Sequence, residues 1–145
     1  MRFLSGDGTS LELAVVGYQF PQLVGVPWDS NWLTIAGRVT LDGREWKFRD
    51  PCLLTNELLA LAEWFQMRSK APNDNSDIGF IEPTLSFEWR QGALQINLDL
   101  EARPSWVRED NAEEFHVRFS PTPDELASAA SSLRADLLKY PIRPA

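Results

Sequence analysis

The side chains with the clearest chemical potential are the only cysteine, Cys52, and the only histidine, His116. A structural zinc ion is usually held by about four cysteine or histidine ligands, so this pair excludes a zinc site of ordinary composition. A Cys–His dyad or a Ser–His–Asp triad would have to use His116, and the GxSxG elbow of many serine hydrolases is missing. Cys52 follows Pro51 near an expected helix, where a small buried apolar side chain is the better interpretation.

The 21 Asp and Glu residues could supply paired carboxylates for glycoside hydrolysis or metal binding. Their spacing selects no pair, and exposed carboxylates commonly do no more than solvate a surface. Residues 73–77 (NDNSD) have the composition of a calcium loop without the spacing of an EF-hand. Glycine-rich patterns that cradle phosphates are also missing from the sequence. The sequence therefore predicts no catalytic, cofactor-binding or metal-binding residue and indicates that the protein is not an enzyme.

The formal net charge of −7 disfavours nucleic acids and anionic membranes as partners. Arg44, Lys47 and Arg49 lie close to Trp46 and Phe48, but three cations in an acidic chain do not make a nucleic-acid groove. The charge favours a basic partner, although small domains also carry such a charge for solubility alone. We therefore expect neither a nucleic acid nor a membrane as the partner.

The length and the cysteine content indicate the class of protein. A chain of 145 residues suits one globular domain over residues 1–145. One cysteine allows no internal disulfide, and residues 1–10 (MRFLSGDGTS) lack the apolar core of a signal peptide. No apolar run approaches the ~20 residues that span a bilayer. We expect a cytoplasmic location.

Alternating apolar and polar residues predict about six strands, joined as hairpins or a meander. Their expected ranges are 11–17, 32–40, 44–49, 80–90, 93–101 and 115–119. Asp42 and Gly43 predict a two-residue turn, because a type I′ turn needs positive φ at both positions. We expect Asp50-Pro51 to end the third strand, and the alternation predicts an antiparallel sheet with one wet face.

Two amphipathic helices are predicted, one in the middle of the chain and one at its C-terminus. Thr55 is the expected cap of the first helix, which runs to about Arg68. Thr122 and Glu125 make a capping box for the second helix, which Pro141 should end. Residues 69–79 and 102–112 are expected loops, the first of them mobile. The predicted fold class is α+β, mainly antiparallel sheet with two helices.

Two tryptophans flank a short polar stretch between an expected loop (18–30) and a strand. Trp28, Asp29, Asn31 and Trp32 could dock a sugar or another small ligand. They could equally fix the loop, with Asp29 and Asn31 bonding to nearby backbone amides. Both interpretations stay open at the level of the sequence.

An ordered set of short strings resembles the WapI-type immunity proteins of bacterial polymorphic toxin systems. The strings are 17–21 (GYQFP), 29–33 (DSNWL), 50–55 (DPCLLT), 63–65 (EWF) and 82–87 (EPTLSF). The resemblance covers roughly residues 11–100, and the C-terminal third fits the pattern only loosely. The resemblance implies a cytoplasmic protein that binds the C-terminal toxin domain of a cognate effector and blocks it by occlusion. It implies no catalytic residue.

Such toxins are often nucleases, whose basic substrate groove would suit an acidic inhibitor. The candidate contact residues are carboxylates on the expected wet faces of the first helix and of the 80–101 hairpin. They are Glu57, Glu63, Glu88, Asp99 and Glu101. The alternative function is a small-molecule or carbohydrate-binding β domain of unknown ligand, using Trp28, Asp29, Asn31 and Trp32.

Overall fold

The strands form two antiparallel sheets of four strands each. The computed structural model describes residues 1–107 and 114–144. Sheet A has the order β1-β2-β3-β4, with β1 at Arg2–Leu4, β2 at Ser10–Tyr18, β3 at Trp32–Leu41 and β4 at Arg44–Leu54. Sheet B has the order β5-β6-β7-β8, with β5 at Ser76–Ile78, β6 at Leu85–Arg90, β7 at Ala93–Leu98 and β8 at Phe115–Phe119.

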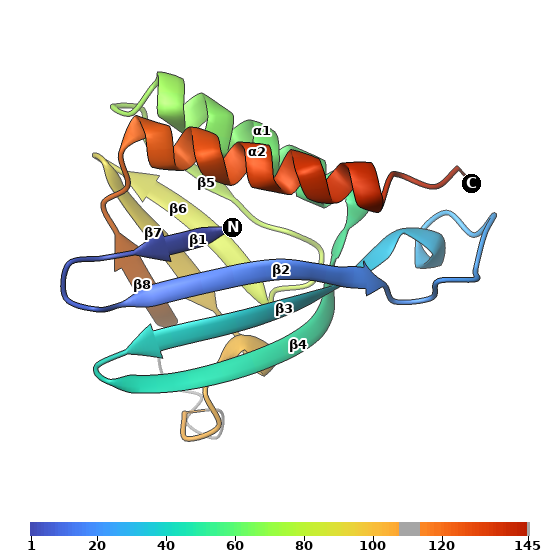
Figure 1. The fold of residues 1–145 in the computed structure, drawn as a ribbon, viewed down its shortest axis with the longest axis horizontal. Helices are drawn as coiled ribbons and strands as arrows, with labels where there is room; N and C mark the ends of the chain where they lie inside the picture. Colours follow the sequence, from blue (N-terminus) through green and yellow to red (C-terminus); the bar gives the residue numbers. More distant parts are fainter. Residues whose placement is uncertain (108–113, 145) are drawn as a thin grey trace.

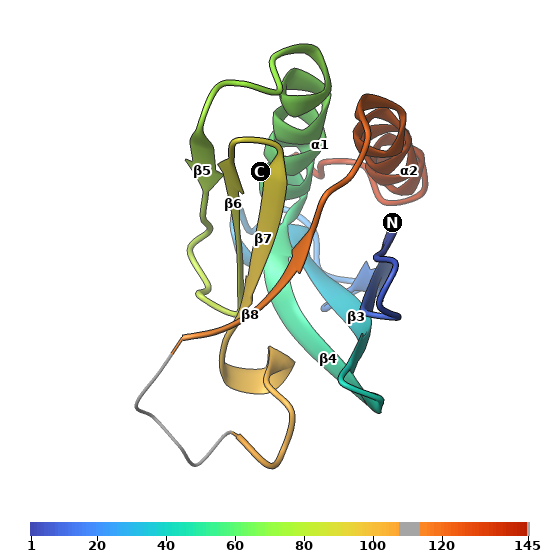
Figure 2. The same cartoon turned by 90° about the vertical axis from the view of Figure 1, so that its left-hand side faces the viewer.

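Two helices, α1 (Thr55–Lys70) and α2 (Pro123–Lys139), lie side by side along one end of the sheets (Figure 1). Figure 2 shows sheet B on one side of the interior and sheet A on the other, with both helices above them. Short 3-10 helices occupy Asp29–Asn31 (η1) and Leu100–Ala102 (η2). The predicted α+β class, with one helix in mid-chain and one at the C-terminus, is confirmed.

Helix α1 buries the stripe that its 3.6-residue period predicts, formed by Leu58, Leu61, Ala62 and Phe65. Its start differs from the prediction, because Leu54 is the N-cap and Thr55 is the first helical residue. Thr55 therefore does not cap the helix.

The capping box predicted for α2 is confirmed. The Glu125 amide donates to Thr122 Oγ1 and the Thr122 amide donates to Glu125 Oε1, both at 3.1 Å. Pro123 occupies the first helical position. A backbone N–H at this position has no intrahelical acceptor, so proline costs the helix no hydrogen bond there. The helix ends at Lys139, just before Pro141, as expected.

The turn at Asp42-Gly43 has the predicted positive-φ geometry, and the turn at Gln91-Gly92 has it too. Asp42 and Gly43 have φ values of 52° and 76°, and Gln91 and Gly92 have 52° and 84°. Two successive positive φ values define the type I′ turn, whose twist matches that of the flanking strands. These turns fix the pairing of β3 with β4 and of β6 with β7.

The prediction that Asp50-Pro51 ends the third strand is wrong. Strand β4 continues through Asp50 and Pro51 to Leu54, and its register against β3 shifts between Leu33 and Ile35. Pro51 falls in this irregularity on an edge strand, where a missing amide donor is tolerated. The continuation brings β4 directly to the first turn of α1.

Other boundaries also differ from the prediction. Strand β7 ends at Leu98, because Leu100 takes a φ of 48° and starts η2. The expected loop over 69–79 contains the last residues of α1 and strand β5, and its mobility stays a prediction. Of the loop expected over 102–112, residues 108–112 lie outside the described part of the chain.

A row of phenylalanine rings joins both sheets to α1. Phe3 of β1 lies 5.7 Å from Phe119 of β8 and 5.7 Å from Phe65 of α1, measured between ring centroids. Phe65 lies in turn 5.6 Å from Phe87 of β6, edge to face. All four side chains are buried. This aromatic row therefore links four elements that are distant in the sequence.

We predict that Phe65→Ala lowers the free energy of unfolding by about 3–5 kcal/mol, because it leaves a cavity at the centre of the aromatic row. Urea denaturation followed by tryptophan fluorescence measures the change. Met67→Ala, at an exposed position on the same helix, is the matched control and should change stability by less than about 0.5 kcal/mol. Equal losses for the two variants would contradict this account of the core.

Candidate functional site

The two acidic candidates on α1 have different surroundings. The Glu57 carboxylate accepts the Leu54 amide at 3.0 Å and the Ile81 amide at 2.9 Å, so it fixes the helix start to the loop before β6. Glu63 is exposed one and a half turns later. Glu57 is thus half-buried and engaged within the fold, whereas Glu63 faces solvent.

Glu88 belongs to a hydrogen-bonded network on the outer face of sheet B. Its Oε2 accepts the side-chain amides of Gln95 and Asn97, each at 2.9 Å. Arg118 Nε donates to Gln95 Oε1 at 3.0 Å, and Arg90 Nη2 lies 3.7 Å from Glu88 Oε1. The network connects β6, β7 and β8, so Glu88 lies in a fixed polar surface.

The same surface reaches the edge strand β5 through Asp77. Arg90 Nη2 donates to Asp77 Oδ2 at 2.9 Å, and this hydrogen bond holds the pKa of the Asp77 carboxyl below its usual range. Both side chains are about half exposed. Solvent screens such a pair, so its role is to orient side chains across the strands.

Asp99 and Glu101 follow the end of β7, two and four residues after Asn97, which donates to Glu88. Asp99 Oδ1 accepts the Leu100 amide at 2.8 Å, which caps η2, and lies 3.3 Å from Arg103 Nε. Asp99 and Arg103 also line a pocket of about 270 Å³, together with Glu114. Glu101 is exposed on η2.

The five acidic candidates therefore have different surroundings. They occupy three places, namely α1, the outer face of sheet B, and the turn at η2. The sequence grouped them because each was expected on the solvent-exposed side of its helix or strand. Periodicity shows on which side of an element a residue lies, but it does not show how far apart two elements are.

Asn31 lies at the centre of a second set of contacts, between the loop 19–28 and the C-terminal tail. Its Oδ1 accepts hydrogen bonds from the Thr55 hydroxyl at 2.7 Å and from the Arg143 backbone amide at 2.8 Å. Its Nδ2 donates to the carbonyls of Pro27 at 3.2 Å and Arg143 at 3.0 Å. A buried amide with two donors and two acceptor positions is saturated by these four bonds. Asn31 thus ties the loop to α1 and to the tail.

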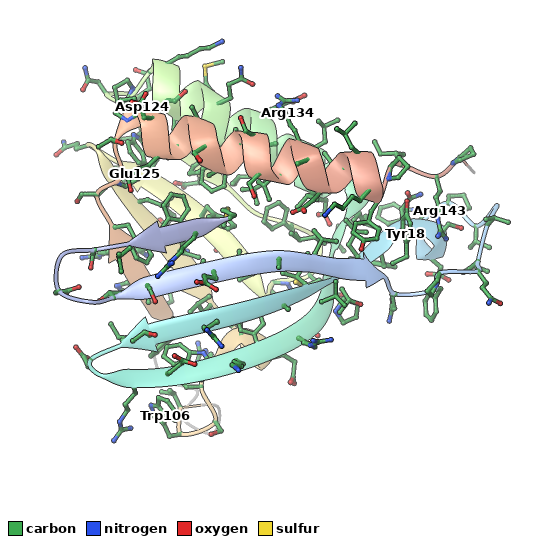
Figure 3. All side chains as sticks on the ribbon, viewed as in Figure 1. Tyr18, Trp106, Asp124, Glu125, Arg134 and Arg143 are labelled. Atoms are coloured by element: carbon green, nitrogen blue, oxygen red, sulfur yellow. The ribbon has the colours of Figure 1, made fainter. Side chains whose placement is uncertain are left out.

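Arg143 holds the same loop from its other side. Its guanidinium donates to the carbonyls of Phe20, Pro21 and Leu23 at 3.2, 2.7 and 2.7 Å. The guanidinium also lies 3.5 Å from the centroid of the Tyr18 ring, and Figure 3 shows the two side chains together at the end of β2. Sequence reasoning missed Arg143, because no local pattern indicates a partner about 120 residues away.

The loop held in this way exposes an apolar surface, which we call the apolar tip. It consists of Phe20, Val24, Val26 and Trp28 of the loop and Ile142 of the tail.

Of the four residues of the alternative ligand loop, the structure brings only Trp28 and Asn31 to a common pocket. That pocket is shallow, has a volume of about 230 Å³, and lies against Leu54, Thr55 and Asn56. Asp29 is exposed in η1, and Trp32 is half-buried in β3. Asn31 supports the loop interpretation, because its polar atoms all bind the protein itself.

Cys52 and His116 lie in different sheets. Cys52 is fully buried in β4, and burial, aided by the charges of Asp50, Glu57 and Glu82, raises the pKa of its thiol to about 12. His116 is half-buried on β8, opposite Asn97. A thiol whose pKa is raised remains protonated and is a poor nucleophile. The Cys–His dyad considered from the sequence is therefore not formed.

Within residues 1–107 and 114–144, no three His, Cys, Asp or Glu side chains come together in a way that could hold a metal ion. In the same part of the chain, no helix has the length and hydropathy to cross a bilayer.

Comparison with known proteins gives one match. The family model described as "Immunity protein WapI-like family" matches residues 2–141. The match extends beyond residues 11–100, which the resemblance covers, and includes β8 and α2. A search of curated proteins found no match, and a search of solved structures found none either.

We predict that Asn31→Ala lowers the free energy of unfolding by about 2–3 kcal/mol, because it leaves the buried Thr55 hydroxyl and backbone groups of the loop and tail unpaired. Urea denaturation measures the loss. Asp29→Ala, two residues away and exposed, should stay within about 0.5 kcal/mol of the wild type. If Asn31→Ala were as stable as Asp29→Ala, the contacts of Asn31 would not hold the loop.

A second prediction concerns pH and Cys52. Because the thiol pKa is raised from 9.0 to about 12, the folded chain keeps a proton that the unfolded chain releases within this window. Stability should therefore fall as the pH rises above 9.0, by up to roughly 1.4 kcal/mol per pH unit from this group. Urea midpoints at about pH 8 and about pH 10 should drop less for Cys52→Ala than for the wild type. If the urea midpoints of the wild type and of Cys52→Ala fell by the same amount, Cys52 would make no contribution to the pH dependence of stability.

Proposed function

Since the chain belongs to the Immunity protein WapI-like family, and so has an immunity role, we propose that it binds the toxin domain of a cognate effector and neutralises it by occlusion. The observation that carries this proposal is the match of the family model, which covers almost the whole chain and includes both sheets and both helices. Immunity proteins of this kind are in general not enzymes, and we propose the same for this chain.

The arrangement of the surface side chains supports a binding role. The outer face of sheet B is a polar network that is fixed before any partner arrives, and the loop 19–28 is held by Asn31 and Arg143. Surfaces that are already ordered lose little conformational entropy on association. Cys52, which could act as a nucleophile, is instead buried and protonated.

The charge supports a basic toxin domain. The net charge of −7 would attract a partner with a positively charged substrate groove, and we propose that this partner is a nuclease. Exposed carboxylates such as Glu63 would act mainly on the association rate. We propose that neutralisation takes place in the cytoplasm, where a nuclease would meet its substrate.

Co-expression tests the function directly. We expect that the chain restores growth to cells that express the toxin domain encoded immediately upstream of it, and that the two proteins purify together, because occlusion needs a stable complex. A toxin domain from an unrelated system is the control and should not be neutralised. Continued killing together with a lack of co-purification would refute the proposal.

The proposal that the toxin domain is basic can be tested separately. We expect the association rate constant, measured by stopped-flow fluorescence, to fall by about tenfold or more as salt is raised from about 50 mM to about 500 mM, because salt screens the attraction. The dissociation rate should change much less. An association rate that is insensitive to salt would leave the binding proposal standing and overturn the basic-partner proposal.

A further inference from the structure

The apolar tip exposes more apolar surface than a solvated loop requires. Trp28 is 57% exposed, Val24 is 72% exposed and Phe20 is 42% exposed. Residues 19–28 (QFPQLVGVPW) include no charged side chain. Exposed apolar side chains concentrated on one short loop mark interaction sites in soluble proteins.

The backbone beneath the tip is fixed by contacts that leave its apolar side chains outside. Arg143 binds three loop carbonyls, and Asn31 binds the carbonyl of Pro27. Ser30 Oγ accepts the Val26 amide at 3.0 Å, which closes the turn before η1. The loop backbone that presents Trp28 and Val24 is therefore already ordered and loses little conformational entropy on binding, and such preorganisation strengthens association.

Carboxylates lie beside the tip. Trp28 and Ile142 share a pocket with Asn56 in the first turn of α1, directly next to Glu57. Glu57 accepts the Ile81 amide and is half-buried. Asp29 is exposed immediately after Trp28. The tip is thus an apolar centre with Asp29 and Glu57 near it, and with the Arg143 guanidinium bound to its backbone carbonyls.

We propose that the apolar tip is the binding centre for the toxin domain, and that Trp28, Val24 and Phe20 enter an apolar crevice of that domain whose margin is basic. The proposal deepens and rests on the proposed function. Interfaces commonly have a few aromatic anchors at an apolar centre, surrounded by a polar rim that excludes water. The tip fits that pattern, and the net charge of −7 fits a cationic partner.

The net charge of −7 also argues against two other occupants. In a symmetric dimer the same patch contacts itself, so two chains of the same negative net charge would approach each other. Such an approach is electrostatically unfavourable. An anionic membrane would be repelled for the same reason. A basic protein surface is the occupant that the charges favour.

The test compares exposed apolar side chains at two ends of the molecule. The dissociation constant for the toxin domain encoded upstream is measured by calorimetry with wild type, Trp28→Ala, Val24→Ser and Leu4→Ala. Leu4 is 58% exposed on β1, at the end of the fold remote from the tip, and is the matched control (Figure 1). We expect Trp28→Ala to weaken binding by about 30-fold or more and Val24→Ser by several-fold, with Leu4→Ala unchanged. Urea midpoints should stay at the wild-type value for all three variants.

The outcomes separate the inference from the function on which it rests. If the wild type binds and Trp28→Ala and Val24→Ser bind equally well, the tip is not the binding centre and the function stands. If the wild type does not bind or neutralise the toxin domain, the proposed function fails and the inference fails with it. Sedimentation velocity of the free chain adds a third outcome. A dimer that Trp28→Ala converts to a monomer would assign the tip to a second copy and overturn the inference.

Discussion

The contact between Phe65 and the rings of Phe3 and Phe87 is the interaction on which the rest of the structure depends. It brings α1 into the interior between β1 of sheet A and β6 of sheet B. Once α1 is fixed there, its first turn defines where β4 ends and where the loop before β6 attaches through Glu57. Burial of one apolar helix face thus sets the positions of surface groups that are far apart in the sequence.

The surfaces of the protein are ordered by contacts of the protein with itself. Polar side chains of sheet B bind one another across three strands, and Asn31 and Arg143 use their polar groups to hold the loop 19–28. The exposed groups that could meet a partner include the apolar side chains of the tip and carboxylates such as Glu63. Such a surface suits the recognition of another protein, and the immunity role of the family agrees with it.

Local patterns predicted the elements that local physics determines. The capping box at Thr122 and the turn at Asp42-Gly43 have their expected geometry, because each depends on neighbouring residues only. Strands β1 and β5 were missed, since three residues are too few to show alternation. The course of β4 through Pro51 depends on its place at a sheet edge, and the contacts of Asn31 depend on a residue 112 positions away. Neither the course of β4 nor the contacts of Asn31 can be derived from a short stretch of sequence. Whether Glu57, Glu88 and Asp99 lie together also depends on the fold, and the sequence alone could not test it.

The central claim is that this acidic chain neutralises its toxin by forming a complex and not by altering the toxin chemically. The most direct measurement is a titration of the purified chain into a fixed amount of the toxin domain while the toxin's activity is followed. The account predicts that inhibition rises linearly and is complete at one equivalent, and that unmodified, active toxin is recovered after the complex is separated in denaturant and refolded. Complete inactivation by a small fraction of an equivalent, with a lasting change in toxin mass, would contradict it.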